Sequence, residues 1–280
     1  MEKKINITKA SGQKVPFSED RYRLSLQKSG ASEVQIDRIL KEIKPELYEG
    51  MATHELYKKT YELMQKKKML SSGGRYNLRR AILELGPTGF PFERYVARLM
   101  EAQGFKTLVD QTVSGKCIHH EIDIIATRGN ERLFVECKFH HEPGDRCGIQ
   151  TTLYVKARYD DMRGSEQDHI KGPRYDQCYL ITNAKFSSDS VDYGRCIGMS
   201  LLGWSYPHNK GLEKIIDELG LHPITSLSTI PKKVLPELFQ QGIIFCYELL
   251  QHSSLLHQLG LNEAKAHEVL QECKAICRKE

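Results

Sequence analysis

The sequence predicts a multidomain chain of the α+β and α/β classes. Its expected parts are a β-hairpin with a small helical bundle (residues 1–88), a mixed sheet flanked by helices (89–228) and a small helical module (229–280). The 280 residues are enough for two or three domains. Glycine and proline interrupt the helical pattern at ELGPTGFP (84–91), and LSTIPKK (227–233) has the composition of a second joint. Between these breaks the expected order is α-β-β-β-α-β-β, which indicates a mixed sheet.

The N-terminal segment predicts two short strands, at 4–9 and 15–18, around the turn SGQK. Helical patterns follow at 19–29, 33–43, 53–67 and 72–85. Ser32 is a candidate cap of the second helix, and Thr53 and Ser72 provide the start signals of the third and fourth.

The central segment begins with an amphipathic helix at 91–103, whose apolar stripe includes Phe92, Val96 and Leu99. The elements expected after it are strands at 106–113, 120–127 and 132–140, a helix at 151–163, a strand at 177–184, a short helix at 191–196, a strand at 197–204 and a helix at 211–219. The C-terminal segment reads as short helices joined by glycine turns at GII (242–244) and LGL (259–261), with a last helix at 262–278.

The composition is that of an ordinary globular chain, with 40% hydrophobic and 28% charged residues. We expect a cytoplasmic protein without a membrane span, because no apolar run approaches about 18 residues and the N-terminus lacks a signal-peptide core. Residues 1–90 contain 18 Lys and Arg against 11 Asp and Glu, whereas the rest contains 23 against 25. This basic excess favours an anionic partner such as a nucleotide or nucleic acid, and a solvated basic surface is the alternative.

The eight cysteines form no CxxC pair, so reduced packing residues are expected. A zinc site is a second interpretation, although its spacing fits no standard pattern. Its candidate ligands are Cys117, His119, His120, Cys137, His140, His141 and Cys147.

Charged residues interrupt two apolar strands in EIDIIATRGNERLFVECKFH (121–140), at Asp123, Glu136 and Lys138. Alternation along a strand places Glu136 and Lys138 on one face, and a hairpin brings Asp123 beside them. Two carboxylates held close repel each other, and a divalent cation removes that cost. Oxygen ligands without histidine suit Mg²⁺ or Mn²⁺, which assist phosphodiester hydrolysis, with Lys138 placed to orient water or stabilise charge. A structural ion pair is the alternative.

Three stretches resemble the PD-(D/E)XK nucleases, specifically the Mrr-like restriction endonucleases: FERYVARLMEAQGF (92–105), EIDIIA (121–126) and FVECKFH (134–140). The resemblance covers about 92–205. It implies a Mg²⁺- or Mn²⁺-dependent DNA endonuclease similar to type II and type IV restriction enzymes. Asp123 and Glu136 would bind the metal, with Glu93 on the first helix as a supporting acid and metal ligand. Lys138 would be the catalytic lysine, and Gln150 a weaker candidate. Ile122 replaces the proline of the family's name.

The first 90 residues resemble the ATP-cone, a nucleotide-sensing module. The matching stretches are INITKASGQKVPFSEDRYRLSLQ (5–27), PELYEGMATHELYKKTYELM (45–64) and RYNLRRAILELGP (75–87). The resemblance implies regulation by ATP or dATP, with phosphate contacts from Lys9, Arg21 and Arg80. Thr53 and Tyr57 would border the nucleotide. A degenerate cone kept only as a fold is the alternative.

Residues 235–276 resemble helix-hairpin-helix modules, whose turns offer backbone N–H groups to DNA phosphate; a protein-interaction bundle is the alternative. Together these resemblances imply a nucleotide-regulated endonuclease acting on double-stranded DNA, often as a homodimer. Two other functions remain open: a nucleotide-responsive DNA-binding regulator with an inactive nuclease fold, and an RNA nuclease.

Overall fold

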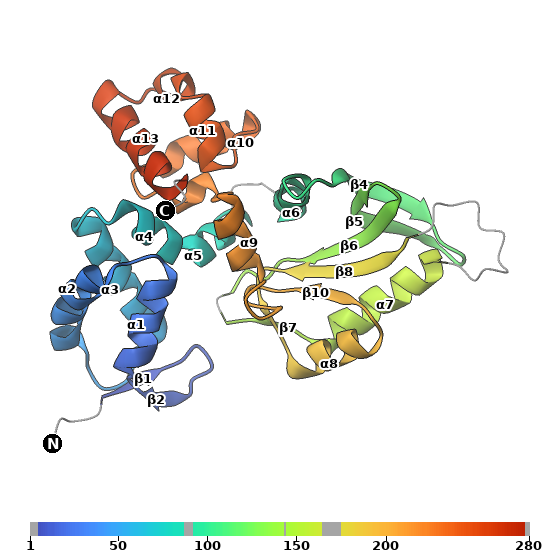
Figure 1. Cartoon of the computed structure of the whole chain (residues 1–280), viewed down its shortest axis with the longest axis horizontal. Helices are drawn as coiled ribbons and strands as arrows, with labels where there is room; N and C mark the ends of the chain where they lie inside the picture. Colours follow the sequence, from blue (N-terminus) through green and yellow to red (C-terminus); the bar gives the residue numbers. More distant parts are fainter. Residues whose placement is uncertain (1–4, 87–91, 143, 164–174, 278–280) are drawn as a thin grey trace. The chain divides into compact units, whose positions relative to one another are not determined.

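The computed structural model describes residues 5–86, 92–142, 144–163 and 175–277. The chain forms two compact units, one from Met1–Glu84 with Gly220–Glu280 and the other from Leu85–Leu219 (Figure 1). The expected C-terminal module therefore packs in the same unit as the N-terminal segment. The joint expected at 84–91 falls mainly on residues 87–91, which lie outside the described residues.

The first unit begins with a three-stranded sheet and five helices. The strands, in the order β2-β1-β3, are β1 (Asn6–Thr8), β2 (Lys14–Pro16) and β3 (Met51–Ala52); β1 pairs antiparallel to β2 and parallel to β3. The helices are α1 (Glu19–Lys28), α2 (Glu33–Ile43), α3 (Thr53–Lys66), α4 (Leu70–Tyr76) and α5 (Leu78–Leu83). The hairpin and the first three helices confirm the prediction, whereas the two-residue β3 was too short to predict.

Two of the three predicted helix starts, at Ser32 and Thr53, are confirmed. Ser32 caps α2 in a capping box with Gln35, as predicted. Thr53 is the first residue of α3 and caps nothing, because the cap position belongs to Ala52. The helix expected at 72–85 is two helices, α4 and α5, which meet at Asn77.

The C-terminal segment contributes two short 3₁₀ turns, η3 (Ile224–Ser226) and η4 (Lys232–Val234), and four helices, α10 (Leu235–Gln240), α11 (Cys246–Gln251), α12 (Ser254–Gln258) and α13 (Glu263–Cys277). The glycine turns are confirmed, since Gly242 and Gly260 follow α10 and α12 with φ of +77° and +82°. This segment packs directly on the N-terminal helices. Thr225 Oγ1 donates to the Ala81 carbonyl at 2.7 Å, and a Cβ on Gly74 would overlap the side chain of Ile276.

Glu272 on α13 fixes the loop that precedes η4. Its side chain is buried, with 1% exposed, and its two oxygens accept four hydrogen bonds. The donors are the backbone N–H and hydroxyl groups of Ser228 (3.0 and 2.7 Å) and of Thr229 (2.8 and 2.7 Å). A buried carboxylate is tolerated here because each oxygen is paired.

Glu272→Gln is expected to lower the free energy of unfolding by about 3 kcal/mol. The glutamine amide has one acceptor oxygen, and its N–H₂ group would face the N–H and hydroxyl donors of Ser228 or Thr229. Urea unfolding of the full chain measures the loss. Glu263→Gln on the same helix is the control: its side chain is 91% exposed, and its effect should stay within about 0.5 kcal/mol. Equal losses for the two variants would contradict the role of Glu272.

The second unit is a five-stranded mixed sheet with helices on both faces (Figure 1). The strand order is β10-β8-β6-β5-β4, with β4, β5 and β6 antiparallel and β6, β8 and β10 parallel. The strands are β4 (Lys106–Ser114), β5 (His119–Arg128), β6 (Glu131–Lys138), β8 (Gln177–Thr182) and β10 (Ser200–Leu202), and β7 (Arg146–Cys147) and β9 (Lys185–Phe186) form a separate pair. The mixed sheet predicted from the sequence is confirmed.

Four helices accompany this sheet: α6 (Phe92–Glu101), α7 (Ile149–Arg163), α8 (Ser188–Cys196) and α9 (Leu212–Leu219). In Figure 1 α6 lies above the sheet, and α7 and α8 lie below it. The core under α7 joins Val155, Tyr159 and Met162 to Phe134 and Ile125 of the sheet. None of the described helices combines the length and the apolar content needed to cross a membrane.

Candidate active site

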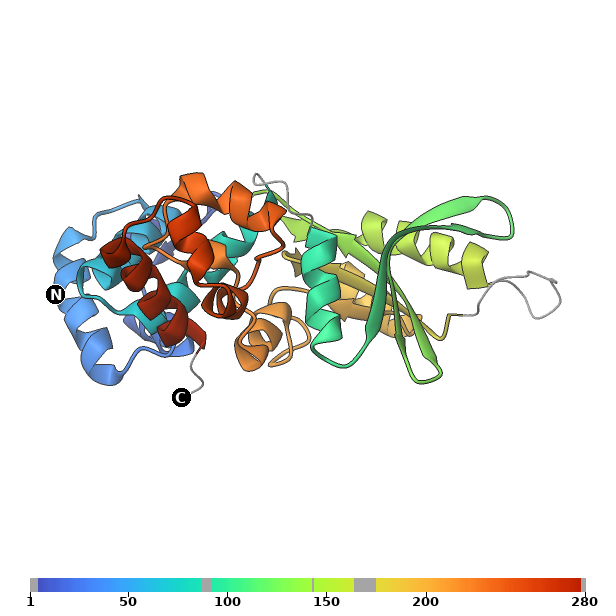
Figure 2. The same cartoon turned by 90° about the horizontal axis from the view of Figure 1, so that it is seen from above.

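The site lies where β5 separates from β6. Their ladder ends at the pair Ile124 and Val135, one step before Asp123 and Glu136 would face each other. Beyond that point β6 stays paired with β8 as far as Lys138, while β5 stays paired with β4. Figure 2 shows the long hairpin of β4 and β5 curving away from the rest of the sheet.

A backbone distortion accompanies this separation. Asp110 on β4 has φ of +54°, and the β4–β5 ladder pairs Val109 with Ile124 and Gln111 with Ile122 but omits Asp110 and Asp123 between them. Aspartate tolerates this left-handed conformation better than most residues. The distortion lies at the level of Asp123, where the pairing of β5 with β6 has already ended.

Asp123 satisfies the backbone group that the separation exposes. The Cys137 N–H, which has lost a partner on β5, donates to Asp123 Oδ2 at 2.7 Å. In a strand the N–H and C=O of one residue point to the same side, so the Cys137 carbonyl also faces the gap. The gap between the strands therefore offers a carboxylate and a carbonyl as oxygen ligands.

Glu136 lies opposite Asp123 and forms a buried ion pair with Arg158 of α7. The pair joins Glu136 Oε1 to Arg158 Nη1, and the side chains are 14% and 11% exposed. Arg158 also donates to the Glu121 carbonyl and lies over the rings of Tyr154 and Phe134. The second oxygen, Glu136 Oε2, is buried without a hydrogen-bond partner among the described residues. That oxygen is free to bind a cation.

Both carboxyl groups are hard to ionise. Burial raises the pKa of Asp123 to about 6, which the Cys137 N–H opposes and the charge of Glu93 reinforces. Burial and the charge of Asp123 raise the pKa of Glu136 to about 7, against the influence of Arg158. A divalent cation beside them would favour the ionised forms.

The raised pKa values predict that stability falls as pH rises from about 4 to about 7. In that window the native state holds protons that the unfolded chain has released, so the slope of the unfolding free energy with pH is negative. At about 1.4 kcal/mol per pKa unit, the loss is a few kcal/mol. Urea unfolding in EDTA at several pH values should show this loss in the wild type and a weaker one in Asp123→Asn/Glu136→Gln. A constant difference between the two proteins across the pH range would contradict it.

Lys138 is held by the end of β8. Its carbonyl accepts from Thr182 Oγ1 at 2.6 Å, and Asn183 bonds both the N–H and the carbonyl of His140, each at 2.8 Å. The Lys138 side chain is exposed, and its ammonium forms no ion pair within the described residues. The backbone of the predicted catalytic lysine is therefore fixed while its charge stays available.

The two supporting candidates are placed differently. Glu93 lies in the first turn of α6, beside Phe92, whose ring packs against Phe139 at 5.5 Å. Its charge acts on Asp123. Gln150 is exposed at the start of α7, and no described hydrogen bond joins it to the carboxylates.

The described residues contain no group of three His, Cys, Asp or Glu side chains able to hold a metal ion. The zinc interpretation therefore gains no support, and His120 instead bonds Asp161 at 2.7 Å. Asp123, Glu136 and Glu93 do not form such a three-residue group either. Asp123 and Glu136 lie on the two strands that border the gap, and Glu93 lies on α6.

The five candidate nucleotide residues are spread over the first unit. Lys9 bonds Gln13 in the turn between β1 and β2, and Arg21 is exposed on the first turn of α1. Thr53 begins α3. Tyr57, one turn further, stacks on Tyr76 at 4.9 Å and donates to Asn77 Oδ1 at 2.9 Å.

Arg80 on α5 bonds Glu84 at 2.9 Å. Burial raises the pKa of Tyr57, and the charge of Arg80 opposes that shift. No described hydrogen bond or ion pair links Lys9 or Arg21 to Arg80.

Arg158 is the site residue that sequence reasoning missed. It stands on the buried stripe of α7, three residues after Val155 and four before Met162. A cation on the apolar face of a predicted helix requires a buried anion. That signal was available in the sequence, although it did not identify Glu136 as the partner.

Two family models match parts of the chain. The restriction endonuclease family model Mrr_cat matches residues 86–202, and the model described as AF1548-like, C-terminal, matches residues 222–277. Neither covers residues 1–85, so the resemblance of that segment to the ATP-cone stays a prediction.

A relative from Archaeoglobus fulgidus, described as an uncharacterized protein, is 38% identical over 182 residues, which cover 65% of this chain and 99% of the relative. A solved structure titled "Crystal Structure of Protein of Unknown Function AF1548" is also 38% identical. It superposes with a TM-score of 0.53 and covers 66% of this chain and 96% of its own.

Proposed function

The chain belongs to the AF1548-like family, and on this premise we propose that it is a metal-dependent endonuclease that hydrolyses DNA phosphodiester bonds. The restriction-endonuclease-like domain supports a nuclease-type enzyme with DNA as its substrate. The observation that carries the proposal is the pair Asp123 and Glu136 at the opening between β5 and β6. Both carboxyl groups are hard to ionise there, and one oxygen has no partner.

In the proposed site Asp123, Glu136 and the Cys137 carbonyl hold Mg²⁺ or Mn²⁺, with Glu93 as a supporting acid. The bound ion would supply a water molecule of lowered pKa and polarise the phosphodiester. Lys138 shares the face of Glu136 and stabilises the negative charge that develops on the phosphate. Arg158 opposes the rise in the pKa of Glu136 and orients its carboxylate. Gln150, at the start of α7, is a weaker candidate for contact with substrate.

The N-terminal segment is proposed to regulate the enzyme by binding ATP or dATP through Lys9, Arg21, Thr53, Tyr57 and Arg80. The supporting observations are the basic excess of residues 1–90 and the hairpin followed by helices, which is the architecture implied by the ATP-cone resemblance. A homodimer is part of this proposal, because two sites are needed to cut two strands.

A second function, DNA binding without cleavage, is favoured by one observation. Arg158 already neutralises Glu136, as it would in a nuclease fold that has lost its metal. The presence of Lys138 and of the unpartnered Glu136 oxygen weighs against this function, because neither is needed for DNA binding without cleavage.

Supercoiled plasmid incubated with the purified chain and Mg²⁺, with and without ATP or dATP, separates the two functions. Nicked or linear product that disappears in EDTA supports the enzyme, and a change of rate with nucleotide supports regulation. A mobility shift that weakens with salt, without any product, supports the binding protein. An RNA duplex in parallel tests the choice of nucleic acid.

A further inference from the structure

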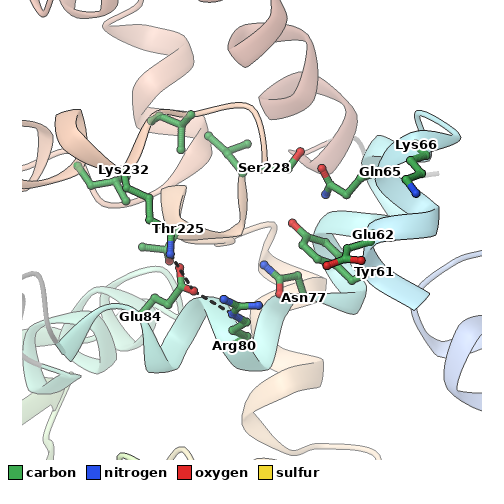
Figure 3. Close-up of a pocket in the computed structure, with 13 residues that line it drawn as sticks. Tyr61, Glu62, Gln65, Lys66, Asn77, Arg80, Glu84, Thr225, Ser228 and Lys232 are labelled. Carbon is green, nitrogen blue, oxygen red and sulfur yellow. Dashed lines mark hydrogen bonds and ion pairs between the residues drawn. The ribbon is translucent and has the colours of Figure 1, made fainter. Parts of the chain in front are cut away.

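The first unit contains a cavity of about 420 Å³ between the N-terminal helices and the segment around η3 and η4 (Figure 3). Its walls come from α3, the junction of α4 and α5, and residues 225–235. A cavity of this size is suited to a small molecule. We propose that it binds a small organic phosphate with a flat apolar body, such as a mononucleotide.

Cations from both walls meet at one carboxylate in this cavity. Glu84 Oε1 accepts from Arg80 Nε at 2.9 Å and from Lys232 Nζ at 3.4 Å, although Arg80 and Lys232 are far apart in sequence. The guanidinium has four further N–H donors and the ammonium two. The arrangement therefore binds one anion already and keeps donors for a second, and a phosphate oxygen is well suited to them.

Asn77 supplies a neutral donor beside these cations. Its side chain is 95% buried, and its Oδ1 is occupied by the Tyr57 hydroxyl. Its Nδ2 has no hydrogen-bond partner among the described residues, and Asn77 lines the cavity next to Arg80 (Figure 3). This N–H₂ group would donate to a ligand oxygen in the cavity.

The remaining wall is suited to a flat apolar group. Leu227, Ile230, Leu235 and Tyr61 all line the cavity. Glu272 holds the adjoining loop through Ser228 and Thr229, so this wall is fixed in place. A base stacked against an aromatic ring and aliphatic side chains gains on the order of 1 kcal/mol or more.

The cavity carries mixed charge, with Lys66, Arg80 and Lys232 against Glu62 and Glu84. It differs from the set of residues assigned to ATP or dATP above, of which only Arg80 lines it. Its segment 225–235 lies outside the part of the chain that resembles the ATP-cone. Binding of a small phosphate in this cavity does not require nuclease activity.

Calorimetric titration of the full chain with AMP, ribose 5-phosphate and inorganic phosphate tests the site. We expect one AMP per chain, bound more tightly than ribose 5-phosphate, with inorganic phosphate weakest. Equal affinity for AMP and ribose 5-phosphate would show that the apolar wall does not contact the base. No binding of any probe would show that the cavity is not a binding site for small phosphates.

Variants locate the binding. Arg80→Ala and Lys232→Glu should each weaken AMP at least tenfold, whereas Glu84→Gln should strengthen it severalfold by releasing both cations. The Lys232 side chain is 76% exposed, so its replacement does not endanger folding. Lys14→Ala, an exposed lysine of β2, is the control and should change nothing. Loss of AMP binding in Lys9→Ala or Arg21→Ala, with normal binding in Lys232→Glu, would place the nucleotide at the hairpin. That result would contradict the cavity site and leave the proposed ATP or dATP site in place.

Discussion

Lys138→Ala is expected to lower the rate of Mg²⁺-dependent DNA cleavage by about 10³-fold while leaving the fold and metal binding unchanged. The reason is that the Lys138 side chain is exposed and unpaired within the described residues, so its removal costs no packing. The variant removes a positive charge beside the position expected for the reacting phosphate, and nothing else. Initial rates on a labelled duplex measure the first effect, and Mn²⁺ titration measures the second.

The matched control is Lys214→Ala on α9, an exposed lysine that pairs with Glu218. It should cleave at the wild-type rate. If Lys138→Ala also kept the wild-type rate, the lysine would have no role in catalysis. If it lost metal binding together with activity, its role would be to shape the site and not to stabilise charge.

Arg158→Ala is expected to destabilise the protein by about 3 kcal/mol, because it removes the buried ion pair and Glu136 must then bury a lone charge or take up a proton. Since the charge of Arg158 opposes the effect of burial, its loss should raise the pKa of Glu136 further. Metal binding should then require a higher pH than in the wild type. Urea unfolding and Mn²⁺ titration across pH measure the two effects.

Arg195→Ala is the control for this change, because the Arg195 side chain is 70% exposed and its partner Asp192 is equally open. Its loss should stay within about 0.5 kcal/mol. Similar unfolding free energies for Arg158→Ala and Arg195→Ala would show that the buried pair contributes nothing to stability.

Much of the second unit follows from its sequence. Apolar β-branched runs predict β5 and β6, and charges inside those runs single out Asp123, Glu136 and Lys138. The end of the ladder at Ile124 and Val135 could not be predicted. It depends on a left-handed residue in the middle of β4, and nothing in the local sequence marks Asp110 as distorted.

The first unit was less predictable because its assembly depends on contacts that are distant in sequence. Gly74 lowers the helix propensity of its segment, yet the absence of a side chain there leaves room for Ile276 of α13. Glu84 and Lys232 are separated by 148 positions and meet at the cavity. Local periodicity identifies each of these helices but carries no information on which of them pack together.

The most direct test of the central claim is cleavage of supercoiled plasmid by the wild type and by Glu136→Gln, purified in parallel and assayed in Mg²⁺, Mn²⁺ and EDTA. The amide keeps the shape of the carboxylate but binds a divalent cation poorly. The wild type is predicted to produce nicked and linear DNA with either metal and none in EDTA, and Glu136→Gln to produce none in any condition. Equal cleavage by the two proteins, or no cleavage by the wild type with either metal, would contradict the assignment of a metal-dependent nuclease site to β5 and β6.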